Sequence, residues 1–115
     1  MKKKFAILTI LALFSVSACA TVSSYENING QSVAVGQTSS GDTIKRFPYL
    51  NGTSLTVRYN NSQAVVTHVI EHPASDAQMR SFVSQASGCR PQAMLNQFNQ
   101  SAQGGITITT YSISC

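Results

Sequence analysis

The sequence predicts a small α+β domain, in which an antiparallel sheet carries two short helices on one face. Three observations point to this class. Segments with strand-like alternation come first, two segments with helical periodicity follow, and a β-branched segment closes the chain. A single sheet, made of a β-meander and a C-terminal strand, would bury the apolar stripes of both helices in a two-layer domain.

A first short strand is expected at Ser32–Gly36, and the predicted meander of two or three strands follows it. An Asn51-Gly52 dipeptide then indicates a hairpin, because both residues tolerate a positive φ. Pro48 lies in the first arm of this hairpin and cannot donate a hydrogen bond to a ladder, so this arm should be an edge strand or only partly paired. A further alternating segment at residues 64–72 completes the meander.

The first helix is expected to begin after Pro73. Ser75 can cap it, and Gln78 three residues later completes a capping box. Gly88 is a typical residue at a helix end. Four apolar residues at helical spacing form the expected core stripe, namely Met79, Phe82, Val83 and Ala86.

The second helix is expected to begin at Pro91, since proline is favoured at the first helical position. Gly104 and Gly105 would end it. Residues 106–115 are rich in β-branched side chains and predict the last strand. The apolar residues assigned to the core face of the second helix are Met94, Leu95, Phe98 and Ala102.

The N-terminal segment has the pattern of a secretory signal. Three lysines, Lys2 to Lys4, precede ten residues of mostly apolar character and then small residues. The apolar part is too short for a transmembrane helix, which needs roughly 20 residues. We therefore expect export, with residues 1–18 as the signal peptide.

The four residues Val16-Ser17-Ala18-Cys19 resemble the lipobox of bacterial lipoproteins, an aliphatic residue and two small ones before a cysteine. The resemblance covers only the leader, and it implies a lipid on the Cys19 thiol with cleavage just before it. Ala20 and Thr21 lack the aspartate associated with inner-membrane retention, so the resemblance implies the outer membrane, with the domain on its periplasmic or its surface face. Residues 19–31 would then be the lipidated cysteine and a polar tether, and residues 32–115 the single domain.

A second cleavage site is present. Ala18-Cys19-Ala20 is also a small-residue pattern of the kind that ordinary signal peptidase cleaves, here after Ala20. Such a cut would release a soluble periplasmic or secreted protein.

The two remaining cysteines are an even pair, which in an oxidising compartment predicts a Cys89–Cys115 disulfide. Closing the loop of about 26 residues between Cys89 and Cys115 would stabilise the fold by about 3–4 kcal/mol on the chain-entropy model. The alternative, a catalytic Cys89 thiol paired with His68 or His72, is disfavoured because a cysteine at the C-terminus is better explained as a structural partner.

The charge of the mature chain argues against nucleic acid as a partner. After the leader, five basic residues face four acidic ones, a net charge of +1, and only Lys45 and Arg46 are adjacent. A phosphate backbone requires clustered positive charge. The mature residues are instead rich in Asn, Gln, Ser and Thr, which suits another envelope protein as partner.

No catalytic, metal or cofactor motif is recognisable in the sequence. His68 and His72 are four residues apart, but on a strand this spacing spans about 13 Å, too far for one metal ion. We expect both to be exposed or at an edge. Tyr49, beside Pro48 and the Asn51-Gly52 turn, is the candidate exposed contact residue. The expected function is therefore non-catalytic: an accessory component of an envelope or secretion assembly, or alternatively a soluble binder or inhibitor.

Overall fold

The computed structural model describes residues 21–101 and 104–115 as one antiparallel sheet of seven strands packed against one helix. The expected signal peptide at residues 1–18, the expected lipidation site Cys19 and the alternative cleavage site expected after Ala20 lie outside the described residues. The elements are β1 Thr21–Ile28, β2 Gln31–Gln37, β3 Thr43–Pro48, a 3-10 turn at Leu50–Gly52, β4 Ser54–Tyr59, β5 Gln63–Val69, α2 Asp76–Ser87, β6 Arg90–Gln100 and β7 Ile106–Ser114.

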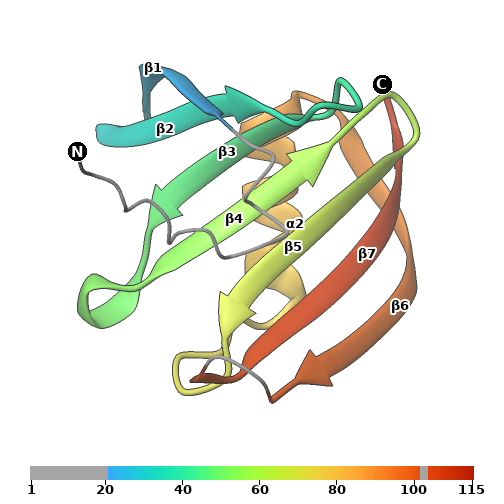
Figure 1. Ribbon diagram of the computed structural model, residues 1–115. Helices are drawn as coiled ribbons and strands as arrows, with labels where there is room; N and C mark the ends of the chain where they lie inside the picture. The colour runs from blue at the N-terminus through green and yellow to red at the C-terminus, as the bar shows by residue number, and fades with distance from the viewer. Residues whose placement is uncertain (1–20, 102–103) are drawn as a thin grey trace.

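The strand order in the sheet is β1-β2-β3-β4-β5-β7-β6, and every neighbouring pair is antiparallel. Figure 1 shows the sheet curving around α2, which lies behind it. Within the described residues, β1 and β6 are the two edges, and no helix or strand covers the face turned away from α2. The α+β class is therefore confirmed, with one helix in place of two.

The core lies between α2 and the sheet face that it covers. Strand alternation selects its members: every second residue is buried along β5, and Leu55 and Val57 are buried in β4. The ring of Phe82 packs edge-on against Phe47, with centroids 5.0 Å apart. The buried apolar residues are Val33, Phe47, Leu55, Val57, Ala64, Val66, Ala74, Met79, Val83, Ala86, Tyr111 and Ile113.

Helix α2 begins and ends where its local signals predict. The Ser75 hydroxyl accepts from the Gln78 amide, while the Gln78 side chain accepts from the Ser75 amide, so the capping box is complete. Gly88 ends the helix with a φ of 74°. Met79, Val83 and Ala86 are buried, and Phe82 is partly buried against the same core.

The hairpin at Asn51-Gly52 is also confirmed. Both residues have positive φ, 52° and 75°. The Tyr49 amide donates to the Thr53 carbonyl, so the connection is longer than the two residues expected. Pro48 is the last residue of β3 and lies beyond the β2–β3 ladder, which ends at Arg46, so this arm is only partly paired, one of the two alternatives expected for it.

The expected second helix is wrong. Residues 90–100 form β6, which pairs with β7 from Arg90↔Ser114 to Gln100↔Ile106. Met94, Leu95 and Phe98, assigned to a buried helix face, are exposed, and Ala102 lies outside the described residues. The physical reason is that β7 has one edge on β5 and would otherwise leave its second row of backbone groups unpaired. Pairing with β6 satisfies these backbone groups of β7. The hydrogen bonds formed outweigh the helical periodicity of residues 90–100.

The expected polar tether at residues 19–31 is also wrong from Thr21 onward. Thr21–Ile28 form β1, which pairs with β2 through the turn at Asn29-Gly30. Both turn residues have positive φ, 52° and 82°. Residues 21–31 are therefore part of the folded domain, which was expected to start at residue 32.

The predicted disulfide is confirmed. Cys89 and Cys115 are bonded, with Cα atoms 4.3 Å apart. Cys89 directly follows the Gly88 cap of α2, and Cys115 directly follows β7. The bond therefore joins the end of the helix to the end of the last strand.

Candidate binding surfaces

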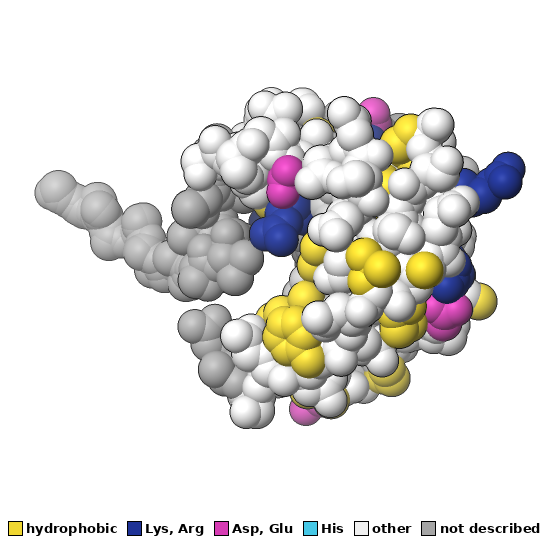
Figure 2. Space-filling view, turned by 90° about the vertical axis from the view of Figure 1, so that its right-hand side faces the viewer, with side chains coloured by type: hydrophobic (Ala, Val, Ile, Leu, Met, Phe, Trp, Pro, Cys, Tyr) yellow, Lys and Arg dark blue, Asp and Glu magenta, His cyan; other side chains and the backbone are white. Residues whose placement is uncertain are grey.

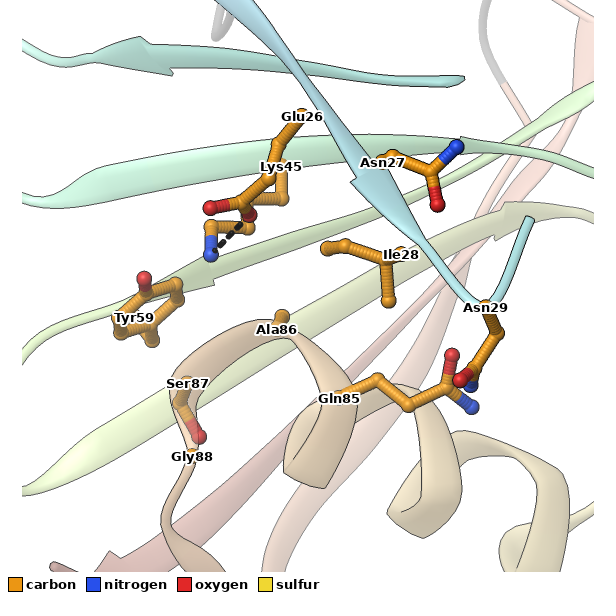
Figure 3. Close-up of a pocket in the computed structure, with 10 residues that line it drawn as sticks. All are labelled: Glu26, Asn27, Ile28, Asn29, Lys45, Tyr59, Gln85, Ala86, Ser87 and Gly88. Atoms are coloured by element: carbon orange, nitrogen blue, oxygen red, sulfur yellow. Dashed lines mark ion pairs between the residues drawn. The ribbon is translucent and has the colours of Figure 1, made fainter. Parts of the chain in front are cut away.

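A hollow lies between the β1–β2 turn and the C-terminal end of α2. Its volume is about 570 Å³, and β1, β3, β4 and α2 all contribute to its wall. Figure 3 shows Ile28 of β1 pointing toward Ala86 at the bottom of the hollow, with Asn29 and Gln85 on one side. The hollow therefore depends on β1 folding back across the helix end.

The other side of the hollow carries an ion pair. Lys45 Nζ lies 2.8 Å from Glu26 Oε1 and 5.9 Å from the centroid of the Tyr59 ring (Figure 3). Burial lowers the pKa of Lys45, but the hydrogen bond to Glu26 and the neighbouring Tyr59 outweigh it, so the net pKa is raised. Lys45 is thus held as a cation that connects β3 to the edge strand.

The hollow offers hydrogen-bonding groups rather than reactive ones. Its lining residues include Asn27, Asn29 and Gln85, which carry amides, and Tyr59, which carries a hydroxyl. These groups could orient a polar ligand, but the lining residues include no histidine or cysteine. Among the described residues, no three of His, Cys, Asp and Glu lie close enough together to hold a metal ion.

A second polar cluster fixes the start of α2 to the sheet. The Tyr111 hydroxyl donates to Asp76 Oδ1 at 2.6 Å, and Arg80 Nε donates to Asp76 Oδ2 at 2.9 Å. Arg80 Nη1 also donates to the Gln92 carbonyl of β6 at 2.8 Å, and its guanidinium lies 5.0 Å from the Tyr111 ring centroid. Burial and the bond to Asp76 raise the pKa of Tyr111. The cluster connects α2, β6 and β7.

This cluster predicts a pH dependence of stability. The hydrogen bonds from Tyr111 and then Arg80 lower the pKa of Asp76 below its ordinary value. The ionised carboxylate therefore stabilises the fold above the unfolded-state pKa of about 3.9, and this contribution disappears as pH falls through the lower folded-state pKa. We expect Asp76→Asn to be less stable than the wild type at pH 7, with a difference that shrinks toward pH 2.

Urea titrations of both chains at several pH values would measure this difference. Asp42→Asn, which removes a carboxylate paired with Arg58 at 3.6 Å, is the control. A stability gap between wild type and Asp76→Asn that stayed constant from pH 7 to pH 2 would contradict the assignment.

The exposed edge of β6 is the third surface. All nine residues from Gln92 to Gln100 are exposed, and none is charged. They include Met94, Leu95 and Phe98, with relative exposures of 39%, 52% and 48%. Figure 2, which looks at the side of the molecule where β6 lies in Figure 1, shows hydrophobic side chains gathered on this side. Large exposed apolar side chains grouped on one edge are typical of an interaction site.

The two histidines are not brought together as a site. His68 is buried at 3% exposure, which corrects the expectation that it is exposed or at an edge. It lies on the α2 side of β5, where alternation continues the buried row of Ala64 and Val66. Its Nδ1 lies 3.0 Å from the Val69 carbonyl, while Nε2 has no partner among the described residues. His72 is half-buried, with Nε2 3.4 Å from Asn51 Nδ2.

Tyr49 and Cys89, the other candidates from sequence, have structural surroundings. Tyr49 is half-buried instead of exposed: its hydroxyl donates to the Pro73 carbonyl at 3.1 Å, and its ring packs edge-on against Phe82. It therefore connects the β3–β4 turn to the start of α2. The Cys89 sulfur is bonded to Cys115, which leaves no thiol there to act as a nucleophile.

Comparison with protein families, with curated proteins and with solved structures found no match for this chain. No helix among the described residues is long and apolar enough to cross a membrane.

Proposed function

We propose that this chain is a bacterial cell-envelope lipoprotein, acylated at Cys19 and directed to the outer membrane, whose domain acts by binding as an accessory component of an envelope or secretion assembly. The observation that carries the proposal is Val16-Ser17-Ala18-Cys19 at the end of an export signal. The Cys89–Cys115 disulfide supports it, because such bonds persist in oxidising compartments.

Lipidation at Cys19 would also orient the domain on the membrane. Thr21, the first residue of β1, follows Cys19 by two residues, a reach of about 7 Å in extended chain. A lipid on Cys19 would therefore hold the β1 edge of the sheet close to the bilayer. β6 is the opposite edge of the sheet, so its uncharged exposed residues would lie at the edge that is not anchored. One acyl chain anchors only marginally and two or more anchor firmly, so the number of chains decides how permanent this orientation is.

The test is the mass of the mature N-terminus together with the membrane fraction in which the protein is found. We expect the wild-type N-terminal peptide to start at Cys19 and to carry acyl mass. Cys19→Ser should lose both the acyl mass and the membrane association, whereas Ser24→Ala, an exposed change in β1, should keep both. A wild-type N-terminus at Thr21 without acyl mass would reject lipidation.

The second candidate is a soluble periplasmic or secreted binder cut after Ala20. One observation favours it: Thr21, which would be its first residue, is also the first residue of β1. Such a cut would leave no unpaired tail before the sheet. The same mass spectrum distinguishes this candidate, and recovery of the wild type in the soluble fraction would support it.

A binding role favours the β6 edge and the hollow as contact surfaces. Phe98 and Leu95 are exposed on the first, and the amides of Asn29 and Gln85 line the second. Crosslinking from each surface in intact envelopes, followed by identification of the attached proteins, would show which one meets a partner.

A further inference from the structure

We infer that two copies of this chain pair through the Asn96–Gln100 segment of β6, antiparallel, with Phe98 facing Phe98 across a twofold axis. The segment runs opposite Thr110 to Ile106 of β7 in unbroken register. Its other side is the edge of the described sheet, where backbone donors and acceptors remain available for another strand. The inference concerns how the domain associates and does not require the lipid.

The side chains of this segment are arranged symmetrically. The sequence is Asn-Gln-Phe-Asn-Gln, so antiparallel self-pairing about Phe98 places Asn96 opposite Gln100 and Gln97 opposite Asn99. Every amide side chain would then face an amide, and the aromatic ring would face its own copy. Directly opposed aromatic residues stabilise antiparallel pairs, and no like charges meet. This self-complementarity favours a second copy over an unrelated partner.

The position of Phe98 gives the pairing an apolar centre. Phe98 lies opposite Ile108, which lies opposite Thr67 of β5, all on the sheet face turned away from α2. Phe98 is 48% exposed there. A second copy would bring another Phe98 and Ile108 against this row, so the apolar row would continue across the twofold axis.

The other parts of the sheet edges carry features that prevent strand addition, and this segment does not. The first half of β6 contains Pro91 and two register shifts that end at Asn96. The opposite edge, β1, has a register shift after Val22 and carries the charged Glu26. Prolines, bulges and charges are the usual means of blocking edge pairing. Asn96–Gln100 contains no proline, bulge or charge, so this edge can accept another strand.

Pairing of like edges closes on itself, because a twofold contact uses the same segment in both copies. A contact between β6 and β1 would instead be head-to-tail, and would give a ring or an open filament. The expected assembly is therefore a dimer. A five-residue edge contact is smaller than a typical stable interface, so the dimer should exchange with monomer, and co-localisation on a membrane would favour it.

A cysteine substitution traps such a dimer. Phe98→Cys, produced from the full chain, should give a disulfide-linked dimer in whole-cell extract, whether or not Cys19 is acylated, with the bond mapped to residue 98 of both copies. Tyr25→Cys is the matched control, since Tyr25 is 71% exposed on the opposite edge, and it should give at least tenfold less dimer. Equal amounts from both variants, or a residue-98 link to a different protein or a different residue, would overturn the inference.

A charge exchange tests the twofold axis itself, by sedimentation of the mature protein at high concentration. Phe98→Lys and Phe98→Glu should each dimerise about tenfold more weakly than the wild type, because the ring pair is lost and like charges meet. An equal mixture of the two should recover dimer, since the introduced lysine would face the introduced glutamate only if position 98 of one copy pairs with position 98 of the other. Single variants that dimerise as well as the wild type, or a mixture that stays monomeric, would contradict the pairing of Phe98 with its own copy.

Discussion

Replacing Cys89 and Cys115 together with serine is expected to lower the free energy of unfolding by about 3–4 kcal/mol, because the unfolded chain then loses the constraint of a closed loop. The two residues are 26 apart in the sequence, which sets the size of that loop. The whole stability of a domain this size is about 5–15 kcal/mol, so the change removes a large fraction of it. Urea unfolding of both chains would measure the difference.

A reducing agent provides the matched control for this experiment. It should destabilise the wild type by a similar amount and leave the double serine variant unchanged, because only the wild type has a bond to break. The native contacts at both ends remain in the variant, since Arg90 and Ser114 still pair in the β6–β7 ladder. A loss below about 1 kcal/mol would mean that the unfolded state is restricted by something other than the disulfide.

Leu55→Ala is expected to destabilise the domain by about 2–5 kcal/mol, the range for truncating a buried leucine. Leu55 is fully buried in β4 on the face covered by α2. The substitution removes apolar contacts and leaves a cavity that the packed sheet and helix can only partly close. Thermal and urea unfolding would both report this loss.

The chain contains a matched control for the same chemical change. Leu50, in the β3–β4 turn, is 53% exposed, so Leu50→Ala should change the stability by no more than about 0.5 kcal/mol. Equal losses from the two variants would contradict the placement of the core between α2 and the sheet.

Local signals predicted α2 and the β3–β4 hairpin well, because both depend on residues close in sequence. The Ser75–Gln78 capping box and the Gly88 cap satisfy backbone groups within one helical turn. Asn51 and Gly52 adopt a positive φ, which glycine tolerates because it has no Cβ and asparagine tolerates better than most residues. These features need no distant partner, so the sequence alone is sufficient to locate them.

The same kind of signal is present at the N-terminal edge. Asn29-Gly30 has the dipeptide and the positive φ values of the Asn51-Gly52 turn, and it makes the β1–β2 hairpin. The sequence predicts a tether for the preceding strand because β1 does not alternate: residues 22–27 are exposed on both faces. A strand without a buried face has no period-two pattern to recognise.

The candidate surfaces could be predicted only in part. The sequence shows that residues 91–101 carry no charge, but it places Phe98 in a buried helix stripe, whereas it lies on an exposed edge. The hollow brings Glu26, Lys45 and Gln85 together from three different elements. Nothing in their spacing along the chain relates them, since their proximity depends on β1 folding over the end of α2.

The sequence by itself determined the boundaries of α2, the turn between β3 and β4, and the pairing of Cys89 with Cys115, which is the one pair left after Cys19 is set aside. Only the tertiary structure decided that residues 90–100 are a strand. Their apolar spacing fits a helix equally well, and the choice depends on hydrogen bonds to β7, which itself must first pair with β5. Backbone pairing across the sheet therefore overrode a local periodicity.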